Sequence, residues 1–416
     1  MIRYILGFVF LITILGCDTS SNIKLPDNSY FIKYFGADGN QEAVDLIVNK
    51  DGTFFILGNS KKSEDAKTQV YIAKADALGK LLWQKTFGNV EMDAKDFLVT
   101  SDGKLAVVAN KLSGSNMDVL LSRYTLDGTP VDSVLLFATT VNAFSEYSNS
   151  LIQLGDGGFI VEGYLTGNIN QSDEMHLRVD KQLQKLPVWS EINGAGSINA
   201  GTTVVQHSSG VFYVFGYTNA SYLGQGKTQV NYWAYKLGAN GVAIDNGDYS
   251  EFEQAGSGLD KTLTDALPAA IGGFLLVGIS NSTSFSLKAS ITNSTDTSFS
   301  LSAAGVFQDV ILLNNLGSGP NPYATAFSST LYNFILVNTY NTASAKSDIL
   351  LMKVDNALAP IWGPVEFGGD GEDNAAAVAE LPDGHIMILG TMNLGNPPEQ
   401  NKIALIKLNS QGKLSP

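Results

Sequence analysis

A short hydrophobic pattern recurs seven times along this chain of 416 residues. Each copy begins at a turn residue, continues as an apolar run rich in β-forming residues, and reaches a small or polar residue six positions later. Repeats of about 40 to 50 residues are typical of propeller blades, and a fixed period of this size restricts the chain to a repeat architecture. The copies start 51 to 62 residues apart, at 52–58 (GTFFILG), 103–109 (GKLAVVA), 157–163 (GGFIVEG), 210–216 (GVFYVFG), 272–278 (GGFLLVG), 332–338 (YNFILVN) and 384–390 (GHIMILG).

Each repeat unit has room for four strands. In the first unit, residues 45–49 (DLIVN) precede the pattern, and residues 70–74 (VYIAK) and 82–87 (LWQKTF) follow it. An Asp-Gly dipeptide separates the first two strands in four units, at positions 51–52, 102–103, 156–157 and 383–384. Such a dipeptide between apolar runs is a strong hairpin signal, because Asp and Gly adopt positive φ angles at low cost. Four antiparallel strands in each unit predict a propeller blade.

The two ends of the sequence complement each other. The seventh unit supplies only three strands, the last at residues 402–408 (KIALIKL), whereas residues 30–35 (YFIKYF) resemble the fourth strand at 82–87. A first strand that completes the last blade would remove two exposed sheet edges. We therefore expect residues 29–416 to form one all-β domain, a seven-bladed β-propeller of four-stranded antiparallel blades closed by its N-terminal strand.

The N-terminal residues predict export and lipid attachment. Residues 1–16 combine the basic Arg3 with a short apolar run, which is typical of a secretory signal peptide. The residues Ile14-Leu15-Gly16-Cys17 resemble the lipobox of bacterial lipoproteins, in which the cysteine is diacylated and becomes the new N-terminus. The resemblance implies that Cys17 carries fatty acids such as palmitate, which would anchor the chain stably to a membrane. Residues 17–28 are polar and are expected to form a flexible tether behind this anchor.

The repeat units also resemble a known group of proteins. Three features are similar to the secreted β-propeller repeats of bacterial cell-surface proteins, which are often lipoproteins: a Phe-Gly link with Asp or Ala five positions after the glycine, the Asp-Gly hairpin, and a Trp in the fourth strand. The resemblance implies a protein at the outer membrane or cell surface, or one that faces the periplasm, and it carries over no catalytic residues. Residues 284–317, rich in Ser, Thr and Asn, depart from the pattern. The fourth-strand residues Trp83, Trp189 and Trp362 are expected to pack blade against blade.

Charge and residue counts argue against several functions. The formal net charge of −14 would repel a phosphate backbone, which argues against nucleic acid as a partner. A single cysteine allows no internal disulfide framework and no Cys₄ or Cys₂His₂ zinc site. The histidines His176, His207 and His385 fall in different units without a His-Glu-x-x-His spacing, and no Gly-x-Ser-x-Gly motif is present. The composition therefore favours a protein that is not an enzyme.

A binding site is expected on the face of the ring that carries the blade links and the loops between second and third strands. Variable loops on a rigid scaffold are where binding usually resides. Carboxylates gather in the links, and aromatic residues in or beside one loop are suited to stacking on a sugar ring. The candidate residues for binding a ligand or a cation are Asp38, Glu42, Asp93, Asp370, Glu372, Asp373, Tyr222 and Trp233. Calcium takes such oxygen ligands, but the same acids also make turn hydrogen bonds and keep a protein soluble.

These observations favour one function and leave two others open. The first is a membrane-anchored, monomeric module that binds a glycan, a peptide or a partner protein through the loop face, without catalysis and with Ca²⁺ as the one candidate cofactor. The second is a hydrolase or lyase that acts on an extracellular polysaccharide through carboxylates on the propeller axis, since glycoside hydrolysis requires a pair of them. The third is a scaffold subunit of an outer-membrane complex.

Overall fold

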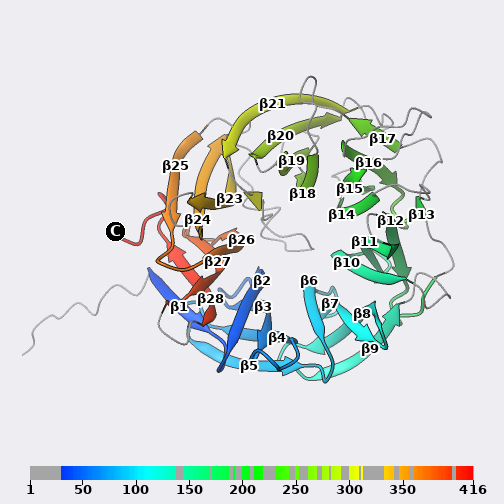
Figure 1. Ribbon diagram of the computed structural model, residues 1–416, viewed down its shortest axis with the longest axis horizontal. Helices are drawn as coiled ribbons and strands as arrows, with labels where there is room; N and C mark the ends of the chain where they lie inside the picture. Colours follow the sequence, from blue (N-terminus) through cyan, green and yellow to red (C-terminus); the bar gives the residue numbers. More distant parts are fainter. Residues whose placement is uncertain are drawn as a thin grey trace, which may run out of the picture.

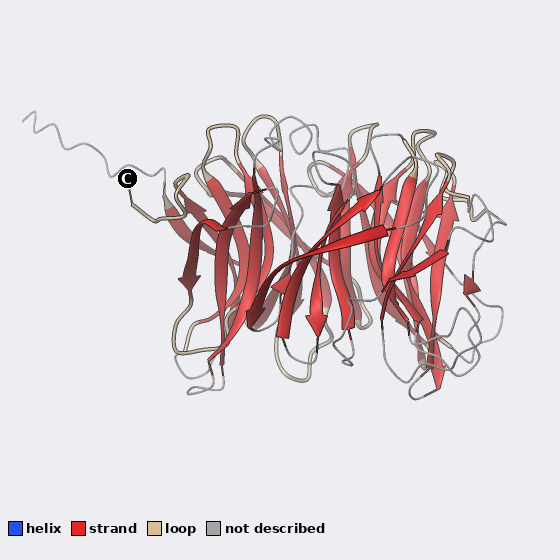
Figure 2. Cartoon of the chain, turned by 90° about the horizontal axis from the view of Figure 1, so that it is seen from above, coloured by secondary structure: helices blue, strands red, loops and turns tan. Residues whose placement is uncertain are grey.

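The computed structural model describes most of the chain downstream of residue 29. It describes residues 30–136, 144–168, 171–186, 191–192, 199–206, 210–218, 231–242, 249–252, 261–268, 274–280, 283–291, 299–308, 311–312, 332–341, 346–355, 360–395 and 400–415. Cys17, the tether and Tyr222 lie outside these residues. The regular elements of the described part are all strands (Figure 2), and no helix there is long and apolar enough to span a membrane.

The strands of the described residues form seven four-stranded sheets. Each pair of neighbouring strands is antiparallel. We number the sheets in chain order, and Figure 1 shows them side by side around a centre. The prediction of an all-β chain built from four-stranded antiparallel sheets is confirmed.

The first four sheets follow the chain without a crossover. Their strands are, in the first sheet, β2 (Asn40–Val48), β3 (Phe54–Lys61), β4 (Gln69–Ala75) and β5 (Leu81–Phe87); in the second, β6 (Met92–Val99), β7 (Lys104–Ser113), β8 (Asn116–Thr125) and β9 (Pro130–Leu136); in the third, β10 (Ser145–Gln153), β11 (Phe159–Asn168), β12 (Gln171–Val179) and β13 (Glu191–Ile192); and in the fourth, β14 (Asn199–Gln206), β15 (Phe212–Thr218), β16 (Asn231–Leu237) and β17 (Tyr249–Phe252).

The seventh sheet is the one that combines distant parts of the chain, because β1 pairs with β28. The strands of the remaining sheets are, in the fifth, β18 (Lys261–Pro268), β19 (Phe274–Ser280), β20 (Thr283–Ile291) and β21 (Phe299–Gln308); in the sixth, β22 (Ile311–Leu312), β23 (Tyr332–Asn341), β24 (Lys346–Asp355) and β25 (Pro360–Phe367); and in the seventh, β26 (Asn374–Glu380), β27 (Ile386–Asn393), β28 (Asn401–Leu408) and β1 (Phe31–Phe35).

The expected tight turns join the first and second strands of several sheets. At Gly103 the backbone has φ +76°, and its N–H donates to the carbonyl oxygen of Thr100 at 2.9 Å. A Cβ at Gly103 would meet no atom within 4 Å. Glycine is therefore required here by the positive φ and not by lack of space.

In six of the sheets that the described residues form, the first strand carries a β-bulge. The register shifts lie between Ala43 and Asp45, Ala94 and Asp96, Ser148 and Ser150, Gly201 and Thr203, Leu263 and Asp265, and Ala375 and Ala377. A bulge leaves one residue unpaired and re-aims its neighbours, so each of these strands presents backbone groups and side chains to the sheet beside it.

Side-chain oxygens from the preceding sheet accept hydrogen bonds at several of these bulges. The N–H of Ala94 donates to Oδ1 of Asn59 at 2.8 Å. Equivalent bonds run from the N–H of Ser148 to Oδ1 of Asn110 at 2.8 Å, from the N–H of Ala375 to Oδ1 of Asn338 at 2.6 Å, and from the N–H of Ala43 to Oγ1 of Thr391 at 2.9 Å. The bond from Ala43 to Thr391 spans 348 residues. It therefore links the seventh sheet to the first by the same kind of hydrogen bond that joins the first sheet to the second.

The core lies between neighbouring sheets. Phe55 and Ile72 of the first sheet pack with Phe97 and Leu105 of the second, and all four side chains are fully buried. The outermost strands are more exposed, as the alternating pattern of β5 shows. The ring of Trp83 in β5 lies against Gly128 of the next sheet, as expected for packing between sheets, whereas Trp189 lies outside the described residues.

Candidate functional site

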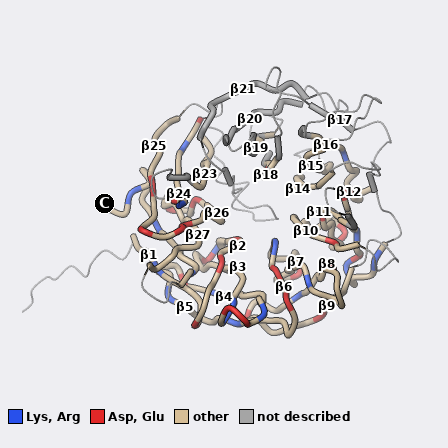
Figure 3. The backbone as a smooth tube through the Cα atoms, in the orientation of Figure 1, with Lys and Arg blue, Asp and Glu red and all other residues tan. Residues whose placement is uncertain are grey.

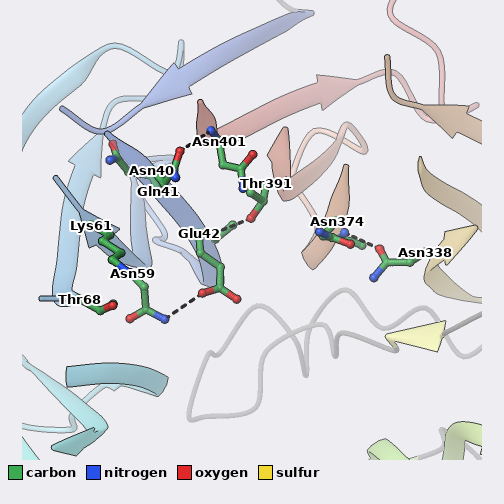
Figure 4. A pocket seen from close by; sticks show the side chains of 12 residues that line it. Asn40, Gln41, Glu42, Asn59, Lys61, Thr68, Asn338, Asn374, Thr391 and Asn401 are labelled. Atoms are coloured by element: carbon green, nitrogen blue, oxygen red, sulfur yellow. Dashed lines mark hydrogen bonds between the residues drawn. The ribbon is translucent and has the colours of Figure 1, made fainter. Parts of the chain in front are cut away.

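A pocket of about 450 Å³ opens where the first, sixth and seventh sheets meet. It lies at the ends of β2 and β26 that follow the links between sheets, which is the face expected from the sequence to bind a ligand. Its lining is rich in amide and hydroxyl side chains (Figure 4), and consists of Asn40, Gln41, Glu42, Ala43, Asn59, Lys61, Thr68, Asn338, Asn374, Ala375, Thr391 and Asn401. We call it the mouth pocket.

One wall of the mouth pocket is organised by Asn59. Its Oδ1 accepts the N–H of Ala94, and its Nδ2 donates to Oδ1 of Asp93 at 2.7 Å and to Oε2 of Glu42 at 3.4 Å. Glu42 alternates with the buried Gln41 along β2, so its side chain is exposed toward the pocket. The structure thus brings two of the predicted acids, Glu42 and Asp93, to one amide.

The opposite wall uses amide oxygens to hold the framework. Oδ1 of Asn338 accepts the N–H of Ala375, and Oδ1 of Asn374 accepts the hydroxyl of Ser347 at 3.0 Å. The N–H of Asn401 donates to Oδ1 of Asn40 at 3.1 Å. Since these oxygens are occupied, the amide NH₂ groups are the donors that this wall can offer to a ligand, beside the exposed carboxylate of Glu42.

The remaining predicted acids lie in other connections. Asp38 is exposed in the β1–β2 connection, where Lys402 donates to the carbonyl oxygens of Ala37 at 2.6 Å and Gly39 at 3.0 Å. Asp370 and Glu372 are exposed in the β25–β26 connection, and Lys346 donates to the carbonyl oxygen of Asp370. These acids stand beside the mouth pocket and not in its lining.

The side chain of Asp373 is fully buried and accepts hydrogen bonds from two backbone N–H groups. Its Oδ2 accepts the N–H of Gly369 at 2.7 Å, and its Oδ1 accepts the N–H of Asn393 at 2.8 Å. Burial raises the pKa of Asp373, and the two backbone hydrogen bonds oppose that rise. Both oxygens thus hold the β25–β26 connection against β27.

The aromatic candidate Trp233 is also buried. Its indole N–H donates to the carbonyl oxygen of Tyr217 at 2.9 Å, and its ring stacks on Tyr235 with centroids 5.2 Å apart. Gly216 in the neighbouring strand makes room for the indole, because a Cβ there would lie 2.9 Å from the ring. The side chain fills the interior of the fourth sheet.

Carboxyl groups at the bulges were not among the predicted site residues. Asp45 and Asp96 follow the bulges of β2 and β6, and their carboxyl groups interact with each other. Burial raises the pKa of Asp45 to about 7. Burial, followed by the charge of Asp45, raises the pKa of Asp96 well above its ordinary range, and Asp265 at the bulge of β18 adds to this effect. Two adjacent carboxyls with raised pKa values retain a proton near neutral pH.

A local signal for these acids is present in the sequence. A polar residue stands immediately before the apolar end of the first strand in five units, as in DLIV (45–48), DFLV (96–99), SLIQ (150–153), TVVQ (203–206) and DALP (265–268). The sequence alone does not show which of these side chains meet, because that depends on how neighbouring sheets are placed.

Acidic and basic residues elsewhere are interspersed along the described chain (Figure 3).

Comparison with known proteins gives no family for this chain. No protein-family model matches it, and no curated protein matches it. Among solved structures, it is similar to prolyl oligopeptidase B from Galerina marginata (11% identity, 85% of this chain, TM-score 0.46), and it spans about half of that protein, 48%. It is also similar to the WD40 domain of SCAP from fission yeast (8% identity, 93% of this chain and 100% of that one, TM-score 0.37). A third similar structure is Penicillium chrysogenum α-L-arabinanase complexed with arabinobiose (11% identity, 91% of this chain and 99% of that one, TM-score 0.45).

Proposed function

We propose that this chain is a non-enzymatic binding module that holds a hydroxyl-rich ligand, foremost a short glycan, in the mouth pocket. The observation that carries the proposal is the lining, in which amide and hydroxyl side chains outnumber the single carboxylate of Glu42 and the single ammonium of Lys61. The amide NH₂ groups donate hydrogen bonds and the carboxylate of Glu42 accepts them, which matches the hydroxyl groups of a sugar. A few placed polar groups are what orients a small ligand in a pocket.

The proposal includes a rigid frame for this pocket. We take the seven sheets as the seven blades of a β-propeller, closed where β1 completes the sheet of β26 to β28. The pairing of Phe31 through Phe35 with Lys407 through Ile403 supports this closure, as does the bond from Ala43 to Thr391. A closed ring protects its sheet edges and fixes the pocket walls relative to one another.

We further propose that the module is monomeric and is tethered to a membrane through lipids on Cys17. In this proposal it acts at the outer membrane or cell surface, or on the periplasmic side. The lipobox-like residues 14–17 support the anchor. Mass spectrometry of Cys17 after expression in a bacterial host that modifies lipoproteins tests it, with Cys17→Ser as the unlipidated control.

The glycan proposal is tested by calorimetric titration of the full chain carrying Cys17→Ser with a panel of oligosaccharides. The double substitution Glu42→Gln with Asn374→Ala removes two polar contacts and should weaken binding roughly tenfold, since each hydrogen bond contributes about 0.5–1.5 kcal/mol. The control Gln411→Ala alters an exposed residue beyond the far end of β28. Absence of glycan binding, or binding that ignores the double substitution, would overturn the proposal.

A second candidate function is supported by the Asp45 and Asp96 pair. Two carboxyls that retain a proton can serve as an acid and a base, which is the chemistry of a polysaccharide hydrolase or lyase. Release of reducing ends or unsaturated products from extracellular polysaccharides, lost in Asp45→Asn, would favour this function. Turnover that persists in Asp45→Asn would remove the pair from consideration.

A further inference from the structure

Three ligand-forming side chains meet inside the third sheet, far from the mouth pocket. Glu162 of β11 and His176 of β12 are direct cross-strand partners. Glu174 lies two residues before His176 and so points to the same face of the sheet. One ligand atom from each residue lies within 4.8 Å of the others, and all three side chains are buried. Spacing along the chain does not reveal this set, because its central contact is made across two strands.

These positions are apolar in the other sheets with described side chains. The pairs that occupy the place of Glu162 and His176 are Leu57 with Ile72, Val108 with Leu121, Phe215 with Ala234, Leu336 with Leu351, and Leu389 with Leu405. All of these side chains are buried. Packing between sheets thus requires no polar group here, and burying three ionisable groups is costly unless something compensates them.

The carboxylate of Glu162 has little of that compensation within the described residues. Its side chain is 0% exposed, neither Oε1 nor Oε2 has a partner there at full hydrogen-bond geometry, and its polar neighbours are the N–H of Gly163 and the carboxyl group of Glu174. It lies against Gly201 of β14, where a Cβ would fall 1.7 Å from Oε1, so glycine leaves the space that the carboxylate fills. The carboxyl group of Glu174 belongs to the same buried cluster, so two acidic groups lie close together here. A proton or a cation between the two carboxyls would relieve this repulsion.

The imidazole of His176 is oriented for ligation. Its Nε2 lies 3.1 Å from the carbonyl oxygen of Gly241, which can only accept, so Nε2 carries the ring proton. Nδ1 then presents its lone pair to the cluster, where the hydroxyl of Tyr235 lies 2.8 Å away. The same hydroxyl donates to Oε1 of Glu174 at 2.6 Å. A backbone carbonyl that holds one nitrogen of a histidine, and so leaves the other nitrogen to act as the ligand, is typical of a metal-binding histidine with its supporting contacts.

We propose that Glu162, Glu174 and Nδ1 of His176 bind a divalent first-row transition metal ion, of the Zn²⁺ class, between the third and fourth sheets. Two carboxylates and an imidazole form a donor set that zinc accepts, and their two negative charges would neutralise the ion. Calcium prefers oxygen ligands throughout and does not suit a site with an imidazole. The ion would act structurally, since β11 and β12 supply its ligands while Tyr235 and Gly241 of the fourth sheet support them.

The test uses the full chain carrying Cys17→Ser, freed of metal by chelator. Elemental analysis after dialysis against Zn²⁺ should find one ion per chain, and the melting temperature should rise by several degrees with Zn²⁺ concentration but not with Ca²⁺. Co²⁺ in place of Zn²⁺ should give the visible absorption of a nitrogen- and oxygen-ligated ion. Binding of no transition metal, with an unchanged melting temperature, would overturn the proposal.

Substitutions assign the ion to the cluster. Glu162→Gln preserves size and should lower the affinity for Zn²⁺ at least tenfold, with circular dichroism checking the fold. The matched control is Glu146→Gln, which alters a buried glutamate of β10 outside the cluster and should leave uptake unchanged. Glu162→Leu restores the residue that the first sheet has at this place. If Glu162→Leu raises the melting temperature and the parent binds no metal, the cluster is a proton-sharing pair of buried acids and the proposal fails.

Discussion

The carboxylate of Asp96 in β6 accepts the main-chain N–H of Leu151 in β10 at 2.7 Å, so a bulge in one sheet holds the first strand of the next. Its other oxygen accepts the N–H of Phe97 at 2.6 Å. In the same way, Oγ of Ser150 in β10 accepts the N–H of Val204 in β14 at 3.4 Å. The polar residue after the bulge therefore serves as a joint to the next sheet in the second and third sheets.

The first prediction concerns this joint. Asp96→Ala leaves the N–H groups of Phe97 and Leu151 without their acceptor in a buried setting, which should cost about 2–4 kcal/mol of unfolding free energy. Denaturant unfolding of the full chain measures this loss. Asp118→Ala is a matched control, since Asp118 is equally buried and lies in β8, away from the bulge. A loss at Asp96 no larger than at Asp118 would contradict the role of the joint.

The second prediction concerns pH. Because burial raises the pKa of Asp45 to about 7, the native chain holds a proton that the unfolded chain releases near pH 4. The native state therefore binds more protons in this window, and unfolding free energy falls as pH rises from about 4 to 7. The slope is at most about 1.4 kcal/mol per pH unit for one proton.

Asp45→Asn mimics the neutral acid and should remove this slope. The measurement is the melting temperature of the parent chain and of Asp45→Asn between pH 4 and 9, compared as a difference at each pH. The variant should gain stability relative to the parent as pH increases and should match it most closely near pH 4. Glu372→Gln, which alters an exposed carboxylate, gives the control profile. Parallel profiles for Asp45→Asn and its parent would contradict a retained proton.

The strands could be predicted because their signals are local. An apolar run after an Asp-Gly turn identifies β7 or β27 without reference to any other part of the chain. The sixth unit shows the limit of this approach. Asn338 accepts the bulge N–H as Asn59 does, and Phe334 pairs with Lys353 as Phe55 pairs with Lys74. The unit is therefore offset by one residue from the pattern at 332–338, which had no glycine to mark its start.

The sites were harder to predict because they depend on contacts between strands and between sheets. Glu42 and Asp93 meet at Asn59 although 51 positions separate them in the sequence, because the second sheet packs beside the first. Glu162 was visible in its repeat as a charged residue at an apolar position, yet its partners lie across β12. The place of Trp233 beside a loop makes it a binding candidate, but its burial depends on the space beside Gly216.

The third prediction tests the turn glycines. Gly103→Ala should cost about 1–2 kcal/mol, because a residue with a Cβ is disfavoured at φ +76° although no atom obstructs it. Gly155→Ala is the control, since its Cβ would also meet open space and its φ is not positive. That substitution should leave stability within about 0.5 kcal/mol of the parent chain. Equal losses from the two, measured by denaturant unfolding, would contradict the conformational explanation.

The fourth prediction separates the neighbours Asp373 and Glu372. Asp373→Ala removes the acceptor of the buried N–H groups of Gly369 and Asn393 and should lower the unfolding free energy by about 2–4 kcal/mol. Glu372→Ala alters an exposed side chain and should change the unfolding free energy by less than about 0.5 kcal/mol.

Thermal unfolding of the same variants with Ca²⁺ and with chelator tests whether the β25–β26 connection also binds the cation expected from its sequence. If Asp373 is occupied by backbone N–H groups alone, Ca²⁺ leaves the melting temperature unchanged in parent and variants alike. A calcium-dependent rise that disappears in Glu372→Ala without loss of stability would instead assign a cation to the exposed acids of the connection.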